Sequence, residues 1–435
     1  MFNENTLKIP AARKFLIAQL HKDVEDNWQE NDTPYHIVNK MIDIIPKDAE
    51  TYVVFFNLEF IEVLVHERNI PPENILFVAD VKIEYLFAKR GYKVNAVLFP
   101  KQTITNESIG NILKGVEMKI GKMAVIGNPP YNSNSNGKDS TPLYHLFVES
   151  IIDNIKPDYF SFIIPSRWMV GGKGLDNHRE RMMNDSRMQK IVHIPDSSSI
   201  FPTVDIKGGV NYFLWNNSYN GPCEFVVGNI STMRKLNQYD IILQDNDAIS
   251  ILEKINSKTN NWISSNCCSR NPFGVNSDYN NWSETGHVCF STRMTKNYIS
   301  SDNFTDKNNI LNKWKVCTSK AGDGGFSNPD KSGKCSVVGK TFILGPGEIC
   351  TETYLVVNYF NTKHECENFI TFMKSKVLRF LLGLRVSTQN ISKDCFSWVP
   401  DMINYNKSWD DSELYNIFGL DSKEISHIES KIKEI

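Results

Sequence analysis

At 435 residues the chain is long for a single core, so we expect two domains, and its composition (41% hydrophobic, 23% charged) is that of an ordinary globular protein. A formal net charge of -2 gives no overall attraction for nucleic acid, so any contact with DNA must use local basic patches. No apolar run spans a bilayer, the N-terminus lacks a secretory core, and nine scattered cysteines show no CxxC spacing, which predicts a cytoplasmic chain without disulfides, a zinc site or membrane contact.

The N-terminal part of the chain predicts two helices. Residues 1–32 show apolar positions among polar ones, and a second amphipathic segment runs over residues 36–45. Asp32 or Thr33 can cap this second helix, and Pro34 fits its first turn. A capped helix accounts for this segment without any functional role.

Strands then alternate with helices. The sequence predicts strands at residues 51–56, 75–80 and 94–99 and helices at residues 61–67 and 81–90. This alternation favours an α/β fold with a Rossmann-like, doubly wound and mostly parallel sheet. Asp80 ends its strand where such folds place an acid on a ribose, and a helix cap is an alternative of comparable weight.

Residues 124–131 combine the sequence of a buried strand with an unusual turn. Residues 124–127 suit a buried strand, and Asn-Pro-Pro-Tyr follows directly. Ligands bind at the carboxyl ends of strands in open α/β sheets. Because each proline fixes its own φ and restricts the preceding residue, we expect the Asn128 side chain, the Pro129 carbonyl and the Tyr131 ring in a nearly fixed arrangement.

This arrangement suits a planar base that carries an exocyclic amine. The Asn128 side-chain oxygen and the Pro129 carbonyl can accept both amino hydrogens, and Tyr131 can stack on the ring. Such hydrogen bonds draw the nitrogen lone pair out of conjugation and aim it at an electrophile. A strand-to-loop turn capped by two prolines is the alternative interpretation.

The following segment continues the α/β pattern. Residues 132–141 form a polar loop that can close over a substrate, and Pro142 opens a helix. Further strands are predicted at residues 159–164, 191–194 and 210–215. Lys173, Arg179 and Arg181 can touch phosphates, although solvated surface charge is the commoner fate of each.

The character of the sequence changes after about residue 235. Residues 257–340 interleave isolated aromatic residues with basic ones in an Asn-, Ser- and Gly-rich background, as reading DNA base edges and phosphates requires. Any loop-rich β domain has the same character. An amphipathic helix is predicted over residues 366–385, and two short helices over residues 409–435.

Together these motifs resemble DNA amino-methyltransferases with the gamma order of motifs, above all the N6-adenine methyltransferases of bacterial and phage restriction–modification systems. Residues 33–35 resemble the leading motif that helps to hold S-adenosylmethionine, and Asp80 matches the acid for the ribose of that cofactor. Residues 124–131 are similar to the catalytic motif and carry the most specific match. The segments similar to the rest of the catalytic sheet, base pocket and recognition region are residues 164–168, 200–202, 208–210, 271–274, 345–347 and 393–400.

The resemblance implies a class I methyltransferase fold and an enzyme that transfers a methyl group from S-adenosyl-L-methionine to an adenine flipped out of double-stranded DNA at a specific sequence. The implied catalytic residues are Asn128, Pro129, Pro130 and Tyr131. The implied cofactor-binding residues are Thr33, Pro34, Tyr35, Phe56, Asn57, Glu59 and Asp80. The residues expected to contact DNA are Ser166, Arg167, Trp168, Lys173, Arg293 and Lys320. No metal is needed, because the transfer is a direct displacement at the sulfonium.

The implied organisation has a catalytic domain over residues 1–235 and an α+β target-recognition and helical region over residues 236–435. The stretch before Thr33 is too short for a nuclease domain. We therefore expect no DNA cleavage by this chain, and a separate restriction endonuclease is a potential partner in the bacterial or phage-infected cytoplasm. RNA or a protein amide remains an alternative target.

One segment departs from the family pattern. The cofactor loop of the family is rich in glycine, because the backbone approaches the cofactor closely and takes unusual dihedral angles. The corresponding residues 55–60 contain no glycine, although Asn57 tolerates a left-handed conformation and Glu59 can bind the amino group of the cofactor. Two interpretations stay open: an altered loop that still holds the cofactor, or a weakened or silent enzyme that binds DNA without methylating it.

Overall fold

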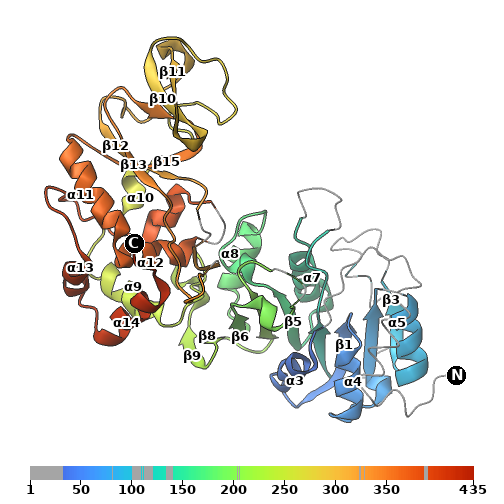
Figure 1. Cartoon of the computed structure of the whole chain (residues 1–435). Coiled ribbons are helices and arrows are strands. Elements are labelled where there is room, and N and C mark those ends of the chain that lie inside the picture. The colour runs from blue at the N-terminus through green and yellow to red at the C-terminus, as the bar shows by residue number, and fades with distance from the viewer. Residues whose placement is uncertain are drawn as a thin grey trace. The chain divides into compact units, whose positions relative to one another are not determined.

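The computed structural model describes residues 33–80, 82–99, 109, 111, 121–133, 141–202, 204, 206–322, 325–327, 329–386 and 390–435. The chain forms two compact units, Met1–Asn246 and Asp247–Ile435 (Figure 1). The sequence placed a boundary at residue 235, and the structure divides at residue 246. The expected helix over residues 1–32, the cap at Asp32 and most of the polar loop over residues 132–141 lie outside the described residues.

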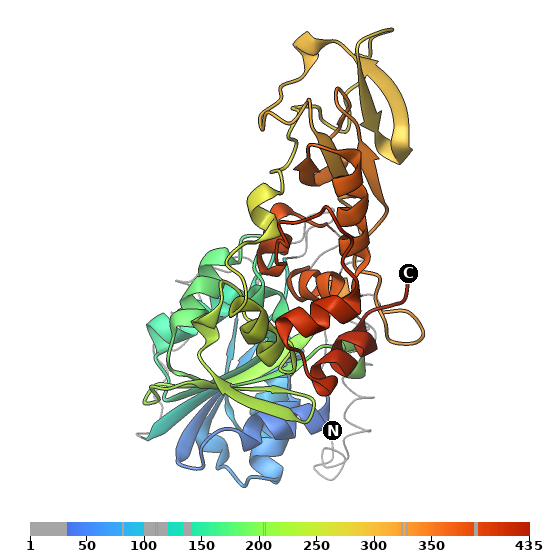
Figure 2. The ribbon, with the colours of Figure 1, turned by 90° about the vertical axis from the view of Figure 1, so that its left-hand side faces the viewer.

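The first unit is built on a nine-stranded sheet in the order β3-β2-β1-β4-β5-β7-β6-β8-β9. Strands β3, β2, β1, β4 and β5 run parallel, whereas β7 runs antiparallel to both of its neighbours. Figure 2 shows the twist of this sheet. The strands are β1 (Ala49–Phe55), β2 (Ile75–Ala79), β3 (Asn95–Leu98), β4 (Lys122–Gly127), β5 (Tyr159–Pro165), β6 (Met188–Ile194), β7 (Val210–Asn216), β8 (Cys223–Val227) and β9 (Ile230–Arg234). The predicted Rossmann-like, mostly parallel sheet is confirmed.

The strand order reverses between β1 and β4. From β1 the chain proceeds outward through β2 and β3, then returns to place β4 on the other side of β1. Phe55, the last residue of β1, is paired in register with Val78 of β2 and Gly127 of β4. Such a switch point leaves a crevice at the carboxyl ends of the two strands, where open α/β sheets bind ligands.

Alternating side chains of the strands build a core on each face of the sheet. Phe55 and Val125 belong to the core on one face, and Val54 and Ala124 belong to the core on the other. The run of buried apolar residues in the central strands follows from this, because a strand covered on both faces exposes neither set of side chains. The helices therefore cover both faces, as a doubly wound sheet requires.

The helices of this unit divide between the two faces according to the cores they join. α3, α4 and the segment after α5 contribute to the core of Val54, whereas α7 and α8 contribute to the core of Phe55. Their bounds are α3 (Tyr35–Asp43), α4 (Glu59–His66), α5 (Lys82–Phe87) followed by the π-helical turn η2 (Ala88–Tyr92), α7 (Tyr144–Ser150) followed by the π-helical turn η3 (Ile151–Ile155), and α8 (Asp176–Asn184).

Two sequence expectations about helix starts are wrong. No side chain caps α3: its N-cap residue is Pro34, whose carbonyl accepts from the N–H groups of Ile37 and Val38 at 2.8 and 3.1 Å, so Thr33 is free of the capping role. Pro142 does not open a helix, because it pairs with Asn132 in an isolated antiparallel bridge and α7 begins at Tyr144.

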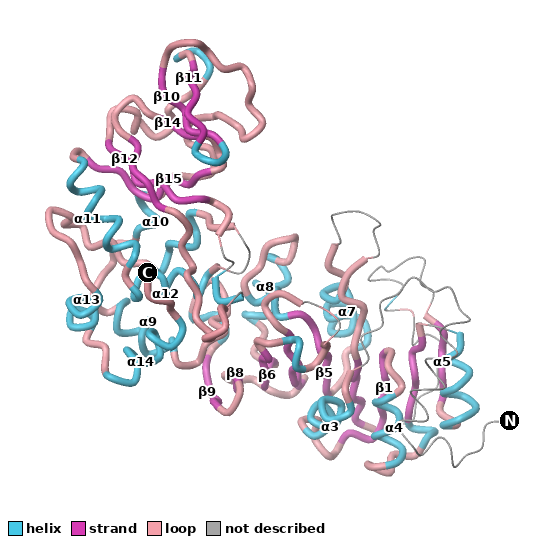
Figure 3. Tube along the Cα trace, viewed as in Figure 1, coloured by secondary structure: helices cyan, strands magenta, loops and turns pink. Residues whose placement is uncertain are grey.

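The second unit is rich in loops and holds two three-stranded sheets, in the orders β11-β10-β14 and β13-β12-β15 (Figure 3). Its strands are β10 (His287–Ser291), β11 (Thr295–Ile299), β12 (Trp314–Ser319), β13 (Thr341–Leu344), β14 (Ile349–Cys350) and β15 (Tyr354–Phe360). Its helices are α9 (Ala248–Asn256), α10 (Ile263–Asn266), α11 (Lys363–Lys374), α12 (Lys376–Arg385), α13 (Asp411–Phe418) and α14 (Ser422–Lys431). None of the described helices of the chain is long and apolar enough to cross a membrane.

The amphipathic segment expected as one helix over residues 366–385 is two helices. Ser375 interrupts it with an extended ψ of 148°, and its hydroxyl accepts from the N–H of Leu378 to cap α12. A serine that caps the following turn ends the preceding helix, because the two backbone conformations are incompatible. The two short helices expected at the C-terminal end, α13 and α14, are confirmed.

Gly127 provides a stability test of the switch point. A Cβ atom at this position would lie 2.2 Å from the carbonyl oxygen of Phe55, so Gly127→Ala forces β1 and β4 apart. We expect the free energy of unfolding to fall by about 1–3 kcal/mol, measured by urea denaturation. Gly339→Ala is the control, because a Cβ there makes an ordinary 3.6 Å contact with Ser319. Equal stability of the two variants would contradict the close strand approach.

Candidate active site

The Asn-Pro-Pro-Tyr turn leaves β4 at the switch point of the sheet. The backbone N–H of Asn128 donates to the carbonyl of Phe55 at 3.2 Å, so the turn is tied to the end of β1 as well as to its own strand. Pro129 is buried, whereas Asn128, Pro130 and Tyr131 are half-buried. These four residues therefore lie at the carboxyl end of β4, next to the end of β1.

A short antiparallel pairing after the turn fixes Tyr131. The N–H of Leu143 donates to the carbonyl of Tyr131 at 2.9 Å, and the N–H of Ser133 donates to the carbonyl of Thr141 at the same distance. Residues 131–133 and 141–143 therefore run antiparallel to each other before α7 begins. Because the hydrogen bond from Leu143 fixes the backbone of Tyr131, its ring has a defined direction at the edge of the sheet.

Phe201 supplies a second aromatic wall beside Tyr131. The two ring centroids lie 6.3 Å apart with the planes at 81°, an edge-to-face arrangement. The hydroxyl of Tyr131 is buried and has no hydrogen-bond partner among the described residues, and this burial raises its pKa well above the usual range. Phe201 thus packs edge-on against Tyr131 and helps to fix the direction of its ring.

The glycine-free loop after β1 adopts the conformation that glycine would give it. Phe56 and Asn57 both have positive φ, at 56° and 64°. This conformation costs a residue with a side chain roughly 1–2 kcal/mol. The Asn57 side-chain oxygen accepts from the N–H of Glu59 at 3.1 Å, which satisfies one of the free N–H groups at the start of α4.

Aromatic packing offsets the strain at Phe56. Its ring contacts those of Phe55, Phe99 and Phe147 edge-on, with centroids 5.8, 6.1 and 5.8 Å away. Each such pair contributes about 0.5–1.5 kcal/mol beyond burial, so the cluster is sufficient to hold the left-handed backbone. The loop lacks the glycines of the family pattern but keeps a glycine-like backbone.

The other residues expected to bind a cofactor lie before or at the start of α3, at the start of α4 and directly after β2. Thr33 and Asn57 are buried, and Thr33 Oγ1 and Asn57 Nδ2 have no hydrogen-bond partner among the described residues. Asp80 directly follows β2 and is half-buried, and Glu59 is buried in the first turn of α4. Tyr35 is exposed. Unsatisfied buried polar atoms are rare in proteins, so they mark places where a ligand or water completes the structure.

Two of the residues expected to contact DNA are buried. Ser166 and Trp168 lie in the 3₁₀ turn η4 (Ser166–Met169) after β5 and are 0% and 1% exposed. The Ser166 hydroxyl lies 2.9 Å from Nδ1 of His193 and accepts from the Asn211 amide at 3.2 Å. A DNA phosphate or base edge cannot reach either side chain in this conformation, so we assign them to packing.

The basic residues of this region differ in their surroundings. Arg179 donates to Asp176 at 2.9 Å and to the Val170 carbonyl at 2.8 Å. Arg181 binds Asp153 through two hydrogen bonds, at 2.8 and 2.6 Å. Both side chains therefore form ion pairs within the first unit, as expected for surface charges and not for phosphate contacts. Lys173 is exposed in a loop of four consecutive positive φ angles, Gly171–Gly174, and Arg167 is half-buried beside it.

In the second unit, Arg293 lies at the tip of the hairpin of β10 and β11. Arg293 and Met294 both have positive φ, at 59° and 60°. The tip is held by a hydrogen bond, in which the N–H of Met294 donates to the Tyr354 hydroxyl of β15 at 2.8 Å. Lys320 follows β12 and is half-buried, with its backbone N–H donating to the carbonyl of Thr353.

Residues 80–201 match the family model described as Eco57I restriction-modification methylase. This segment contains Asp80, the whole Asn-Pro-Pro-Tyr turn and Phe201. A chain from Mycoplasma pneumoniae named as an uncharacterized adenine-specific methylase is 36% identical over 102 residues, which cover 22% of this chain and 24% of that one. The resemblance to restriction–modification methylases is confirmed. The chain spans about a quarter of the length of this curated relative.

Solved structures of restriction–modification proteins show partial likeness to this methylase-like chain. The type IIL restriction-modification enzyme MmeI in complex with DNA aligns over 84% of this chain and 64% of its own, at 7% identity and a TM-score of 0.42. A protein described as a modification subunit of a type I restriction enzyme from Vibrio vulnificus aligns over 54% and 55%, at 16% identity and a TM-score of 0.39.

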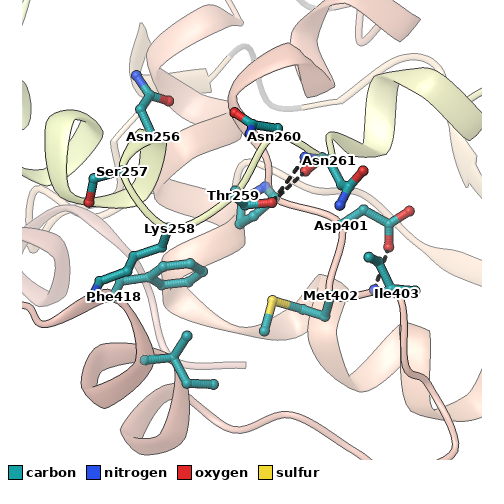
Figure 4. A pocket seen from close by; sticks show the side chains of 12 residues that line it. Asn256, Ser257, Lys258, Thr259, Asn260, Asn261, Asp401, Met402, Ile403 and Phe418 are labelled. Atoms are coloured by element: carbon teal, nitrogen blue, oxygen red, sulfur yellow. Dashed lines mark hydrogen bonds between the residues drawn. The ribbon is translucent and has the colours of Figure 1, made fainter.

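A separate pocket of about 410 Å³ lies within the second unit (Figure 4). Asparagine, serine and threonine side chains of residues 256–261 face Asp401, Met402 and Ile403 across it. The N–H of Ile403 donates to the Asp401 carboxylate at 2.9 Å. The pocket contains none of the residues that the sequence assigned to the methylase-like site, so it does not enter the assignment of that site.

The sequence predicts no individual role for Phe201 beyond its place in the Ile-Phe-Pro segment. It lies 70 positions after Tyr131, and the loop that carries it precedes β7, so only the sheet topology brings the two rings together. An isolated Ile-Phe-Pro has no pattern of its own that would identify a base pocket. The resemblance of residues 200–202 to the family was the available signal.

The buried histidine beside Ser166 generates a pH prediction. Burial lowers the pKa of His193 to about 4, whereas a free imidazole has a value of about 6.5. Between these values the unfolded chain binds the proton and the folded chain does not, so stability falls as the pH is lowered from about 6.5 to about 4. We expect this acidification to lower the free energy of unfolding by on the order of 3 kcal/mol.

Urea denaturation of the wild type and of His193→Asn, each at pH 7 and pH 4, measures the loss of stability that is due to His193. The variant keeps a polar atom near Ser166 and should lose less stability on acidification than the wild type. His36→Asn is the control, because His36 is exposed. The same loss in wild type and His193→Asn would show that His193 is not the group responsible.

Proposed function

We propose that this chain is an S-adenosylmethionine-dependent methyltransferase that modifies N6 of adenine in DNA. The observation that carries the proposal is the position of the Asn-Pro-Pro-Tyr turn. It begins one residue past β4, at the point where the strand order reverses, and it is hydrogen-bonded to the end of β1 just before the strained Phe56–Asn57 loop. A base-binding turn and a cofactor loop are thereby adjacent. The confirmed resemblance to adenine-specific methylases supports the same assignment.

The residues around the crevice fit the cofactor. Asn57 Nδ2 is a buried donor and Thr33 Oγ1 a buried hydroxyl, both without a described partner, which suits a ligand rich in oxygen acceptors such as a carboxylate. Asp80 is placed to accept from the ribose hydroxyls at the end of β2. Glu59 supplies a carboxylate for the amino group. When bound, S-adenosylmethionine supplies the methyl group as a sulfonium electrophile.

The turn orients the target amine. The Asn128 side-chain oxygen and the Pro129 carbonyl accept its two hydrogens, which directs the nitrogen lone pair toward the cofactor side of the crevice. Tyr131 stacks on the adenine, and Phe201 supports the Tyr131 ring edge-on. The base must leave the duplex to reach this turn, at a cost of a few kcal/mol that stacking and hydrogen bonding offset.

We assign DNA contacts to the accessible basic residues. Lys173 and Arg167 lie after β5, close in sequence to the catalytic edge, and suit phosphates that flank the target. Arg293 on its hairpin tip and Lys320 are the candidates in the second unit, which we propose to be the target-recognition unit. We also propose a separate restriction endonuclease in the same cytoplasm as the functional partner. Methylation by this chain would protect DNA from cleavage by that endonuclease.

Asn57→Ala tests the cofactor assignment without any measurement of catalysis. Loss of the buried amide donor should weaken S-adenosylmethionine binding by about tenfold, equivalent to about 1.4 kcal/mol, measured by isothermal titration calorimetry. Asn69→Ala is the matched control, because Asn69 also has positive φ, at 55°, but is exposed. Unchanged affinity in a folded Asn57→Ala variant would remove Asn57 from the cofactor site.

Asn128→Ala tests the chemistry. Without the side-chain acceptor the amine is neither oriented nor activated, so transfer of labelled methyl to duplex DNA should fall by at least about a hundredfold, with an unchanged melting temperature. Asn132→Ala, an exposed asparagine just beyond the turn, should retain full activity. Normal turnover by a folded Asn128→Ala variant, or no transfer by the wild type to any DNA, would refute the proposed function.

A further inference from the structure

Buried polar atoms without partners gather between α7, η4 and α8. Tyr144, Trp168 and His178 are each no more than 2% exposed. The Tyr144 hydroxyl, Trp168 Nε1 and His178 Nε2 have no hydrogen-bond partner among the described residues. The His178 ring centroid lies 6.5 Å from that of Tyr144 and 5.7 Å from that of Trp168. So many unsatisfied atoms in one place call for a physical explanation.

Glu149 determines which nitrogen of His178 faces this cluster. A Glu149 carboxylate oxygen lies 2.8 Å from Nδ1 of His178. Burial alone would raise the pKa of Glu149, but its hydrogen bond with His178 holds that pKa below its usual range. The carboxylate is therefore an acceptor, Nδ1 carries the proton, and Nε2 presents its lone pair to the cluster. A carboxylate that orients an imidazole in this way also stabilises its protonated form.

The chemistry of the cluster fits bound water. Trp168 Nε1 can only donate a hydrogen bond, His178 Nε2 in this tautomer can only accept one, and the Tyr144 hydroxyl can do both. A water molecule satisfies all three, since it accepts from the indole and donates to the imidazole. Sites of this polarity in protein interiors hold ordered water.

The cluster also reaches the catalytic turn. Tyr144 follows Leu143, whose N–H donates to the carbonyl of Tyr131. The Tyr131 hydroxyl is itself buried and without a described partner. Tyr144 lies near enough to add to the effect of burial in raising the pKa of Tyr131. The backbone therefore brings Tyr144, a member of the cluster, next to the base-binding turn.

We propose that Glu149 and His178 form a proton-accepting pair that serves the methyl transfer through water and the hydroxyls of Tyr131 and Tyr144. The inference rests on the proposed function. When the adenine nitrogen forms its bond to the methyl carbon, the carbon–sulfur bond breaks with its electron pair going to sulfur. The nitrogen then carries one proton too many. That proton passes along the hydroxyls and water to Nε2 of His178, where the carboxylate of Glu149 balances the new charge.

The neighbouring charged groups leave this role to His178. On α7, burial lowers the pKa of His145, which disfavours a proton there. Arg167 of η4 faces Tyr144. On α8, Arg181 is neutralised by its two hydrogen bonds to Asp153 of η3. His178, with a carboxylate at Nδ1 and no described partner at Nε2, is the group in this cluster placed to accept a proton.

Single-turnover methyl transfer measured against pH tests the pair. The wild-type rate should fall at acid pH with the uptake of one proton. His178→Gln should slow transfer by about a hundredfold and abolish the acidic limb, with unchanged binding of DNA and cofactor. Glu149→Gln, which keeps a hydrogen-bond acceptor but removes the charge, should move that limb to lower pH. His66→Gln, at an exposed histidine of α4, is the control.

Two readouts separate the possible failures. Nitrogen chemical shifts of the His178 ring should report a proton on Nδ1 and none on Nε2, and this does not depend on turnover. A wild type that transfers methyl while folded His178→Gln and Glu149→Gln variants keep its rate and pH profile would overturn the pair and leave the proposed function intact. A wild type that transfers no methyl at any pH would overturn both.

Discussion

The hydrogen bond from the Asn128 N–H to the Phe55 carbonyl is the contact on which the site depends. It joins the ends of two neighbouring parallel strands where the strand order reverses between β1 and β4. On one side the chain enters the Phe56–Asn57 loop, and on the other it enters the Asn-Pro-Pro-Tyr turn. The sheet thus holds the loop that we propose for the cofactor beside the turn that we propose for the amine. Gly127 permits this contact, because its missing side chain lets the strands approach.

The fold of the first unit could be predicted from the sequence because the apolar runs, the turn residues and the amphipathic segments all indicate the same alternation of strands and helices. Apolar runs such as residues 75–79 are bounded by turn residues and alternate with amphipathic helices, which is sufficient to predict a parallel sheet. The antiparallel insertion of β7 was not predictable in this way, since a fully buried strand has the same composition in either direction. The break at Ser375 was missed because the apolar period continues across it, and only the capping hydroxyl marks the end.

Within the site, local chemistry was predictable and long-range contacts were not. Asn128 and Tyr131 were identified because four adjacent residues define the turn. The partnership of Tyr131 with Phe201, and that of His178 with Glu149, depends on elements that meet only in the folded chain. Ser166 and Trp168 show the converse: their motif resembles a functional one, yet burial gives them packing contacts. The Phe56–Asn57 loop shows that a missing glycine does not settle backbone shape, because aromatic packing can hold a left-handed turn.

The reversed direction of β7 has a consequence for how the methylase-like site is assembled. Had β7 run parallel to β5, its amino end and the loop before it would lie at the far edge of the sheet. Because it runs the other way, Val210 at its start pairs with Pro165 at the end of β5, and the N–H of Ser166 donates to the carbonyl of Gly209. The loop that enters β7 therefore brings Phe201 to the same edge of the sheet as Tyr131. Because one strand is inverted, a connection that enters a strand, as well as those that leave strands, supplies side chains to the proposed site.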